Sequence, residues 1–213
     1  MQAHSKLSKM IKLAFFDFSR TLANDTGFGS GASFMNRKNE YDKLYEDFIS
    51  HKINEEEFIK NGAELWQGFK EKDLIKIHSQ IKLNPNVEEV LNQLKERRIK
   101  LILVTNLPSK LAELYMNLGF SHLFGTECKI KNGIFTGRVL KMNPNKGIVI
   151  KNLCNKLGIN PEECIAVGDS RSDIKMFKVV GYDNSFAYNA NEEVKKYAKH
   201  HIKDFKEIMD IIK

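Results

Sequence analysis

Three aspartates in this chain lie at or just after the end of a short apolar segment. Asp17 follows the apolar run 11–16, Asp169 follows the run 164–167 and Gly168, and Asp173 comes four residues later. A carboxylate can attack phosphorus as a nucleophile, and a pair of carboxylates offers the oxygen ligands that Mg²⁺ prefers. These residues are therefore candidates for phosphate-transfer chemistry.

A hydroxyl, an amide and an ammonium group add to this candidate site. Thr105 and Asn106 follow the apolar run 99–104, and Lys146 lies at the start of a helical pattern. The Thr105 hydroxyl and the backbone N–H of Asn106 can donate to phosphoryl oxygens, and Lys146 can offset their charge. Each residue alone has an ordinary explanation, as a turn or a solvent-facing lysine; helix capping explains one of the later aspartates but not both.

The elements that must position these side chains form an alternating pattern. Apolar runs at 11–16, 99–104, 164–167 and 185–188 read as buried strands, and amphipathic helical patterns separate the last three. Such alternation predicts a doubly wound parallel sheet with helices, an α/β fold. Ligands bind such sheets at the carboxyl ends of the strands, where Asp17, Thr105 and Asp169 are expected to converge.

The segment 23–83 shows no convincing strand and predicts a helical insert. The stripe Tyr41, Leu44, Tyr45 and Phe48 has helical spacing, and similar stripes recur near Trp66 and Ile77. The small, glycine-rich stretch 23–33 before them predicts a flexible loop, with Gly27, Gly29 and Gly31 as a candidate hinge.

Composition narrows the range of partners. The net charge is +7, but the lysines are scattered and alternate with acids, so we expect solvated helix faces and no nucleic-acid partner. No stretch reaches the length of a membrane-spanning helix, and the polar segment 1–9 lacks the apolar core of a signal peptide. These features predict a cytoplasmic protein with no membrane partner; they leave its oligomeric state open.

Taken together, the motifs resemble the haloacid dehalogenase-like (HAD) hydrolase superfamily. The run Phe16-Asp17-Phe18-Ser19-Arg20-Thr21 is similar to the first motif of that family, and Thr105 to the second. Lys146 is similar to the third, and Gly168 to Asp173 to the fourth, all in the family's order. The resemblance implies Mg²⁺ as cofactor, held by Asp17, the backbone carbonyl of Ser19, Asp169 and Asp173, with Asp17 as the nucleophile.

Finer features are similar to the phosphoserine phosphatase branch of the superfamily. The resemblance implies an α/β core of residues 1–22 and 84–213, with a helical cap of residues 23–83. In that branch an acid and an arginine of the cap hold the amine and carboxylate of the substrate. Asp25 and Arg37 are the nearby candidates here, and neither matches convincingly.

Ser19 departs from the family pattern, which has aspartate at this position. The family aspartate protonates the leaving oxygen and later activates water, and a serine hydroxyl is too weakly acidic and basic for either task. We therefore expect a slowed or altered Mg²⁺-dependent phosphatase or phosphotransferase that acts on a small phosphorylated metabolite. The alternative is a non-catalytic phosphate-binding or regulatory relative.

Overall fold

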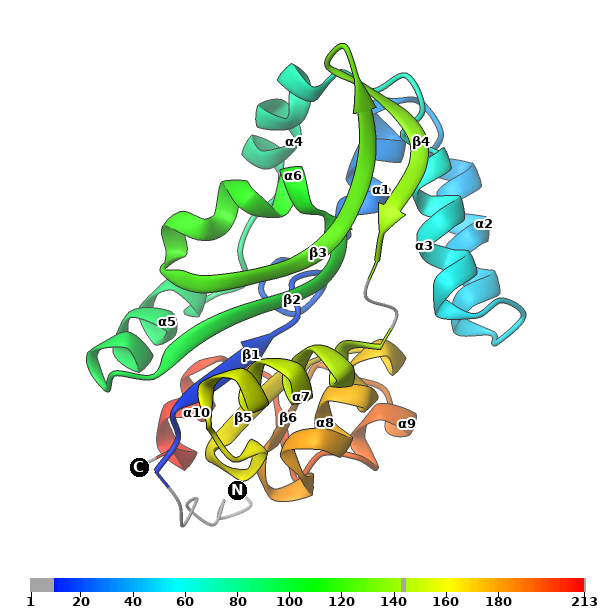
Figure 1. The fold of residues 1–213 in the computed structure, drawn as a ribbon. Coiled ribbons are helices and arrows are strands. Elements are labelled where there is room, and N and C mark those ends of the chain that lie inside the picture. Colours follow the sequence, from blue (N-terminus) through cyan, green and yellow to red (C-terminus); the bar gives the residue numbers. More distant parts are fainter. Residues whose placement is uncertain (1–9, 143–144, 213) are drawn as a thin grey trace.

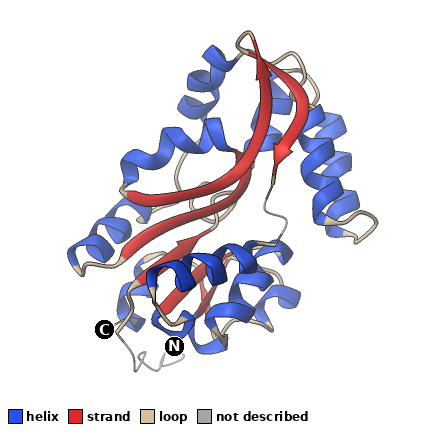
Figure 2. Cartoon of the chain, in the orientation of Figure 1, coloured by secondary structure: helices blue, strands red, loops and turns tan. Residues whose placement is uncertain are grey.

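The architecture is a single seven-stranded sheet with helices on both faces, as the alternating pattern predicts (Figures 1 and 2). A computed structural model describes residues 10–142 and 145–212. The strand order is β4-β3-β2-β1-β5-β6-β7, and neighbours pair in parallel except β3 and β4. The strands are β1 Leu13–Phe16, β2 Lys100–Pro108, β3 Phe120–Lys131, β4 Ile134–Lys141, β5 Cys164–Gly168, β6 Ser185–Tyr188 and β7 His200–Ile202.

Ten α-helices occur in the described part of the chain. Their bounds are α1 Gly27–Phe34, α2 Lys38–Ile49, α3 Glu55–Glu64, α4 Leu74–Gln80, α5 Val87–Glu96, α6 Ser109–Ala112, α7 Lys146–Leu157, α8 Ile174–Val180, α9 Glu192–Lys195 and α10 Lys206–Ile211. Short 3-10 helices lie at Glu71–Asp73, Glu113–Leu118, Pro161–Glu163, Arg171–Asp173 and Tyr182–Asn184. Helices α1 to α4 all fall within residues 23–83, between β1 and β2.

Alternation along the buried strands divides the core into two layers. In β1, Leu13 and Phe15 pack into one apolar cluster, and Ala14 and Phe16 pack into the other. Successive side chains of a strand point to opposite faces, so a strand buried on both sides is apolar throughout. Helices α7, α8 and α9 contribute to the first cluster, and α5 and α10 to the second (Figure 1). Both faces of β1 are therefore covered, which leaves its carboxyl end as the place to present a polar side chain.

The glycine-rich stretch is a helix, and its prediction as a flexible loop was wrong. Residues 27–34 form α1, because its glycines allow close packing against bulky neighbours. A Cβ added at Gly31 would lie 2.0 Å from the Trp66 indole, and one at Gly27 would lie 1.5 Å from Leu107. Tertiary packing thus overrides the poor helix propensity of glycine.

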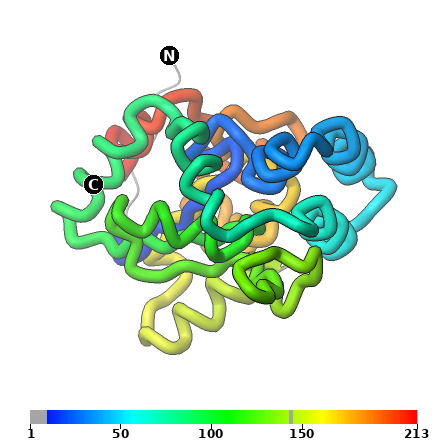
Figure 3. Tube along the Cα trace, turned by 90° about the horizontal axis from the view of Figure 1, so that it is seen from above, coloured from blue at the N-terminus to red at the C-terminus, as the bar shows by residue number. Residues whose placement is uncertain are grey.

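The stripe around Trp66 is also not helical, since α3 ends at Glu64 and a turn follows. This turn docks on the β3–β4 hairpin, which turns at Asn132-Gly133, a residue pair that is typical of tight hairpins. Gly68 N–H donates to the Phe135 carbonyl at 2.9 Å, and Phe135 N–H donates to the Phe69 carbonyl at 2.8 Å. The rings of Trp66 and Phe135 lie 5.3 Å apart. Insert and hairpin therefore lie side by side, as the view from above shows (Figure 3).

The sequence did not predict strand β7 or the full length of β3. The three residues of β7 are too few to show alternation, and β3 alternates weakly because much of it is only half-buried. Within the described ranges, no helix combines the length and apolar character needed to cross a membrane. The segment 1–9, on which the signal-peptide expectation rests, lies outside the described residues.

The close packing of α1 can be tested with a substitution that raises helix propensity but should still destabilise the folded protein. We expect Gly31→Ala to lower the free energy of unfolding by about 1–3 kcal/mol, because the new methyl group meets the Trp66 ring. In an exposed helix the same change stabilises by about 1 kcal/mol. Thermal and urea unfolding measure the difference. Ser33→Ala, at an exposed position of the same helix, is the control and should change stability little. A Gly31→Ala protein as stable as the parent would contradict the close-packing account.

Candidate active site

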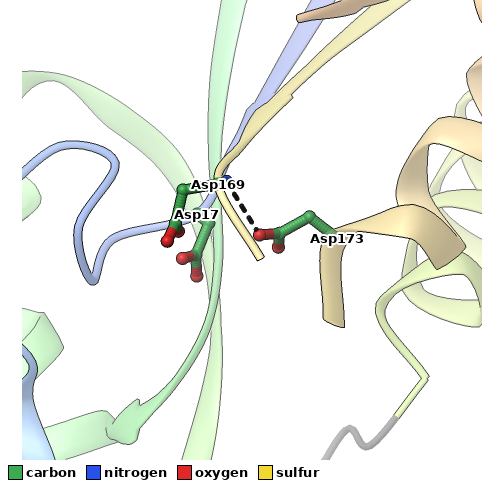
Figure 4. Close-up of side chains that lie close together, drawn as sticks. All are labelled: Asp17, Asp169 and Asp173. Carbon is green, nitrogen blue, oxygen red and sulfur yellow. Dashed lines mark hydrogen bonds between the residues drawn. The ribbon is translucent and has the colours of Figure 1, made fainter. Parts of the chain in front are cut away.

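Three aspartates meet at the carboxyl edge of the central strands (Figure 4). Asp17 directly follows β1, and its N–H donates to the Val167 carbonyl of β5 at 3.0 Å. Asp169 directly follows β5, and Asp173 ends the 3-10 turn after it. Each aspartate offers an oxygen such that the three atoms lie within 4.8 Å of one another. The predicted convergence is therefore present for Asp17 and Asp169, whereas Thr105, expected to join them at a strand end, lies within β2 and outside this group.

The ammonium group of Lys146 joins two of these aspartates. Lys146 Nζ lies 2.6 Å from Asp17 Oδ1 and 2.7 Å from Asp173 Oδ1. The side chains are 1%, 5% and 0% exposed, so this is a buried ion-paired cluster. Lys146 is the first residue of α7, where the Asn145 side chain accepts a hydrogen bond from the Gly147 N–H and caps the helix.

Asp173 is held rigidly by the loop that precedes it. Its Oδ2 accepts hydrogen bonds from the N–H groups of Asp169 and Ser170, at 3.1 and 3.0 Å, and from the Ser170 hydroxyl at 3.0 Å. Gly168 makes room for this arrangement, because a Cβ there would lie 2.4 Å from the Asp173 carboxyl carbon. Asp173 thus completes a capping box with Ser170 on the 3-10 turn, but it makes no side-chain cap bond to α8, and Asp169 takes no part in capping.

Asp169 has a different environment. Its Oδ1 accepts a hydrogen bond from the hydroxyl of Thr21 at 3.1 Å, and Asn84 in turn donates to the Thr21 carbonyl at 2.7 Å. Thr21 is buried and was not among the predicted site residues. Its place in the first motif, four residues after Asp17, is the signal that could have pointed to it.

Burial and like charges shift the proton affinities of the cluster. Burial raises the pKa of Asp17 to about 7, against the lowering effect of Lys146. Burial, together with the charges of Asp173 and Asp17, raises the pKa of Asp169 well above its ordinary value. Burial alone lowers the pKa of Lys146, but the two carboxylates outweigh burial and raise it. The cluster as a whole concentrates negative charge that one ammonium group does not balance.

This donor set fits a divalent cation such as Mg²⁺. The ion is hard and takes carboxylate and carbonyl oxygens as ligands. Asp169 accepts one hydrogen bond on Oδ1, which leaves lone pairs of both its oxygens for a cation. Additional positive charge beside Asp17 and Asp169 would also offset the repulsion between the carboxylates, which adds to burial in raising their pKa values.

A cavity next to Asp17 contains several of the other predicted residues. Ser19, Asn106 and Lys146 line it together with Asp17 and Asp169. Thr105 is buried nearby but does not line the cavity; its Oγ1 accepts a hydrogen bond from the Leu107 N–H at 3.2 Å.

The insert supplies the other side of this cavity, which the sequence did not reveal. Aromatic side chains of α1, α2 and α3 line it, namely Phe28, Tyr41, Tyr45, Phe48 and Phe58. We call these five residues the aromatic wall. Tyr41, Tyr45 and Phe48 belong to a stripe with helical spacing in the sequence, and whether such a stripe faces a core or a cavity depends on how the insert docks.

Comparison with known proteins agrees with this geometry. The family described as haloacid dehalogenase-like hydrolase matches residues 10–181. A phosphoserine phosphatase of Archaeoglobus fulgidus is 30% identical over 202 residues, which are 93% of this chain but 58% of that protein. A phosphoserine phosphatase of Methanocaldococcus jannaschii is 28% identical over 214 residues, 97% of this chain and 100% of that protein.

Solved structures show the same relationship. A phospho-aspartyl intermediate analogue of phosphoserine phosphatase superposes with a TM-score of 0.84 at 28% identity, over 96% of this chain and 100% of the other. A substrate-bound phosphoserine phosphatase complex gives 0.85 at 27% identity, over 97% and 100%. The chain therefore belongs to the haloacid dehalogenase-like hydrolases, in the phosphoserine phosphatase-like branch.

Proposed function

We propose that this protein is a Mg²⁺-dependent phosphatase or phosphotransferase that acts on a small phosphomonoester through an aspartyl-phosphate at Asp17. The observation that carries the proposal is the position of Asp17. It is 4% exposed at the end of a central strand, it is paired with Lys146 at 2.6 Å, and it lines a cavity. A carboxylate so placed is oriented for attack, with a positive charge beside it.

In the proposed first step, an Asp17 carboxylate oxygen forms a bond to phosphorus while the bond from phosphorus to the ester oxygen breaks. Lys146 neutralises part of the charge as carboxylate and phosphoryl group approach. The N–H of Asn106 and the hydroxyl of Thr105 are the proposed donors to phosphoryl oxygens. Asp17, Asp169, Asp173 and the backbone carbonyl of Ser19 would hold Mg²⁺, which when bound offsets the negative charge of the phosphoryl group.

Ser19 determines how the reaction continues. The departing alkoxide needs a proton, and the water that later attacks the aspartyl-phosphate must lose one; a positioned carboxyl group serves both needs. Ser19 lines the cavity but offers only a hydroxyl. We infer a slow enzyme that favours substrates whose leaving group is stable without a proton. Its aspartyl-phosphate would persist long enough for the phosphoryl group to be transferred to acceptors other than water. If even this activity is absent, the protein is a phosphate-binding or regulatory relative.

We also propose that residues 23–83 act as a cap over a core of residues 1–22 and 84–213. In support, the insert brings its aromatic wall to a cavity whose floor is Asp17 and Asp169. Glu55 of α3 accepts a hydrogen bond from the Asn106 side chain at 3.0 Å and pairs with Lys175 at 2.7 Å, which ties the insert to the core beside the proposed phosphate site. Substrate entry would require these contacts to open.

Restoring the missing carboxyl group should accelerate turnover. We expect Ser19→Asp to release phosphate from a simple alkyl phosphate about 10²–10⁴ times faster than the parent protein, because it gains a general acid–base. Ser19→Asn is the matched control, since it has the same shape without a proton to exchange at neutral pH, and it should bring no gain. Asp17→Asn in either background should eliminate release. Equal rates in the aspartate and asparagine variants would show that position 19 does not limit the reaction.

Binding of Mg²⁺ alone provides a second test, independent of turnover. At a free concentration 100 times Kd, the ion should stabilise the folded protein by about 2.7 kcal/mol and raise Tm by several degrees. Asp169→Asn should remove most of this shift. The control is Asp183→Asn, an exposed carboxylate that is paired with Lys199 and is not part of the cluster, which should leave the shift intact. A Tm shift that survives in Asp169→Asn would place the ion elsewhere.

A further inference from the structure

The side chains that line the cavity beside Asp17 suit some organic groups of a substrate better than others. We propose that the site selects phosphate monoesters with a compact aromatic group over those of a charged amino acid. This inference rests on the proposed function, because it concerns the part of the substrate that lies beyond the phosphoryl group.

The aromatic wall is a continuous surface. The rings of Phe48 and Phe58 stack with centroids 4.5 Å apart, Tyr45 and Phe58 lie 6.3 Å apart, and Tyr41 and Tyr45 stack at 6.2 Å. The same cavity is lined by Asp17. An ester bound for attack by Asp17 must therefore point its organic group toward these rings, and aromatic groups gain most from such contacts.

The charged groups that line the cavity already have partners or belong to the catalytic cluster. Lys146 is bound between Asp17 and Asp173. Arg20 donates a hydrogen bond to the hydroxyl of Tyr45, and its guanidinium carbon lies 5.4 Å from the centre of that ring. The acids of the lining are Asp17 and Asp169. A substrate ammonium group would thus find no acid on the cavity lining that is free of the proposed metal and nucleophile positions.

Two acids of the insert that could pair with an amine face other groups. Asp25 accepts hydrogen bonds from the Thr26 N–H at 2.6 Å and from the Ser30 hydroxyl at 2.8 Å. Both oxygens of Glu55 are engaged, one by Asn106 and one by Lys175. Neither acid lines the cavity.

The candidate arginine for a substrate carboxylate is likewise turned away. Arg37 donates to the carbonyl of Leu65 at 3.1 Å, at the end of α3, and does not line the cavity. The amine of a phosphoserine would therefore lose water without gaining an acid partner, and its carboxylate would have to draw Arg20 away from the Tyr45 hydroxyl; both are costly. An uncharged aromatic group incurs no such penalty.

The volume of the cavity sets the size of a suitable probe. It is about 60 Å³, whereas an apolar cavity known to hold benzene measures about 150 Å³. Entry of a ring therefore requires the insert to move outward. Besides the contacts of Glu55, those of Arg171 would have to open, since its guanidinium carbon lies 4.5 Å from the Phe48 ring and it donates to the Ile53 carbonyl at 3.4 Å. A benzyl group is therefore a suitably small aromatic group for a binding probe.

Binding of non-cleavable phosphonates in the presence of Mg²⁺ tests the inference without relying on turnover. The probes are benzylphosphonate, ethylphosphonate and 2-amino-4-phosphonobutyrate, which carries the amine and carboxylate of phosphoserine. We expect benzylphosphonate to bind at least about tenfold more tightly than either of the others by isothermal titration calorimetry. Equal or tighter binding of the amino-acid phosphonate, or no binding of any of the three, would overturn the inference.

Substitutions in the aromatic wall test whether these residues cause the preference for benzylphosphonate. Tyr45→Ser should reduce the ratio of benzyl to ethyl affinity by about tenfold. Tyr45→Leu keeps an apolar side chain at this half-buried position and is therefore more certain to fold. It should also reduce the ratio of benzyl to ethyl affinity. Ile49→Ala, at an exposed position of the same helix that does not line the cavity, is the control and should leave the ratio unchanged. An unchanged ratio in both Tyr45 variants would contradict the assignment.

Hydrolysis of acetyl phosphate, which has no aromatic group, separates this inference from the proposed function. Turnover of acetyl phosphate without a benzyl preference would refute the aromatic selectivity and leave the proposed chemistry standing. A benzyl preference without turnover would refute the proposed chemistry and leave the selectivity standing.

Discussion

The buried contact of Lys146 with Asp17 and Asp173 is the interaction on which the site depends. Two carboxylates and an ammonium group are almost fully removed from water, and each is tolerable only because the others are present. The contact requires the end of β1, the turn before α8 and the first residue of α7 to meet at one edge of the sheet. Loss of the lysine would leave two buried carboxylates unpaired, a cost that reaches several kcal/mol in comparable cases.

The parts of the site that lie at strand ends could be predicted from the sequence. Parallel strands that are buried on both faces appear as short apolar runs, and their carboxyl ends necessarily share one edge of the sheet. Asp17 and Asp169 were identified as candidates in this way, and Lys146 because it lies at the start of a helical pattern. Local signals of this kind depend on only a few neighbouring residues.

The features that depend on docking between distant segments could not be predicted. Gly27 and Gly31 suggested a hinge, but they lie in a helix because Leu107 and Trp66 leave no room for a side chain. Tyr45 and Phe48 have the spacing of a packed helix face, and only the position of the insert over Asp17 makes them part of a cavity. Glu55 gave no signal, because its partners Asn106 and Lys175 are more than fifty residues away in the sequence.

The central claim is that Asp17 carries the phosphoryl group and that Ser19 prolongs its lifetime. Mass spectrometry of the intact protein, quenched in acid at intervals after mixing with acetyl phosphate and Mg²⁺, tests this claim directly, with fragment analysis to locate the adduct. The account predicts one phosphoryl group on Asp17 that decays more slowly than in Ser19→Asp. An adduct on another residue, or phosphate release with no adduct at any time, would contradict it.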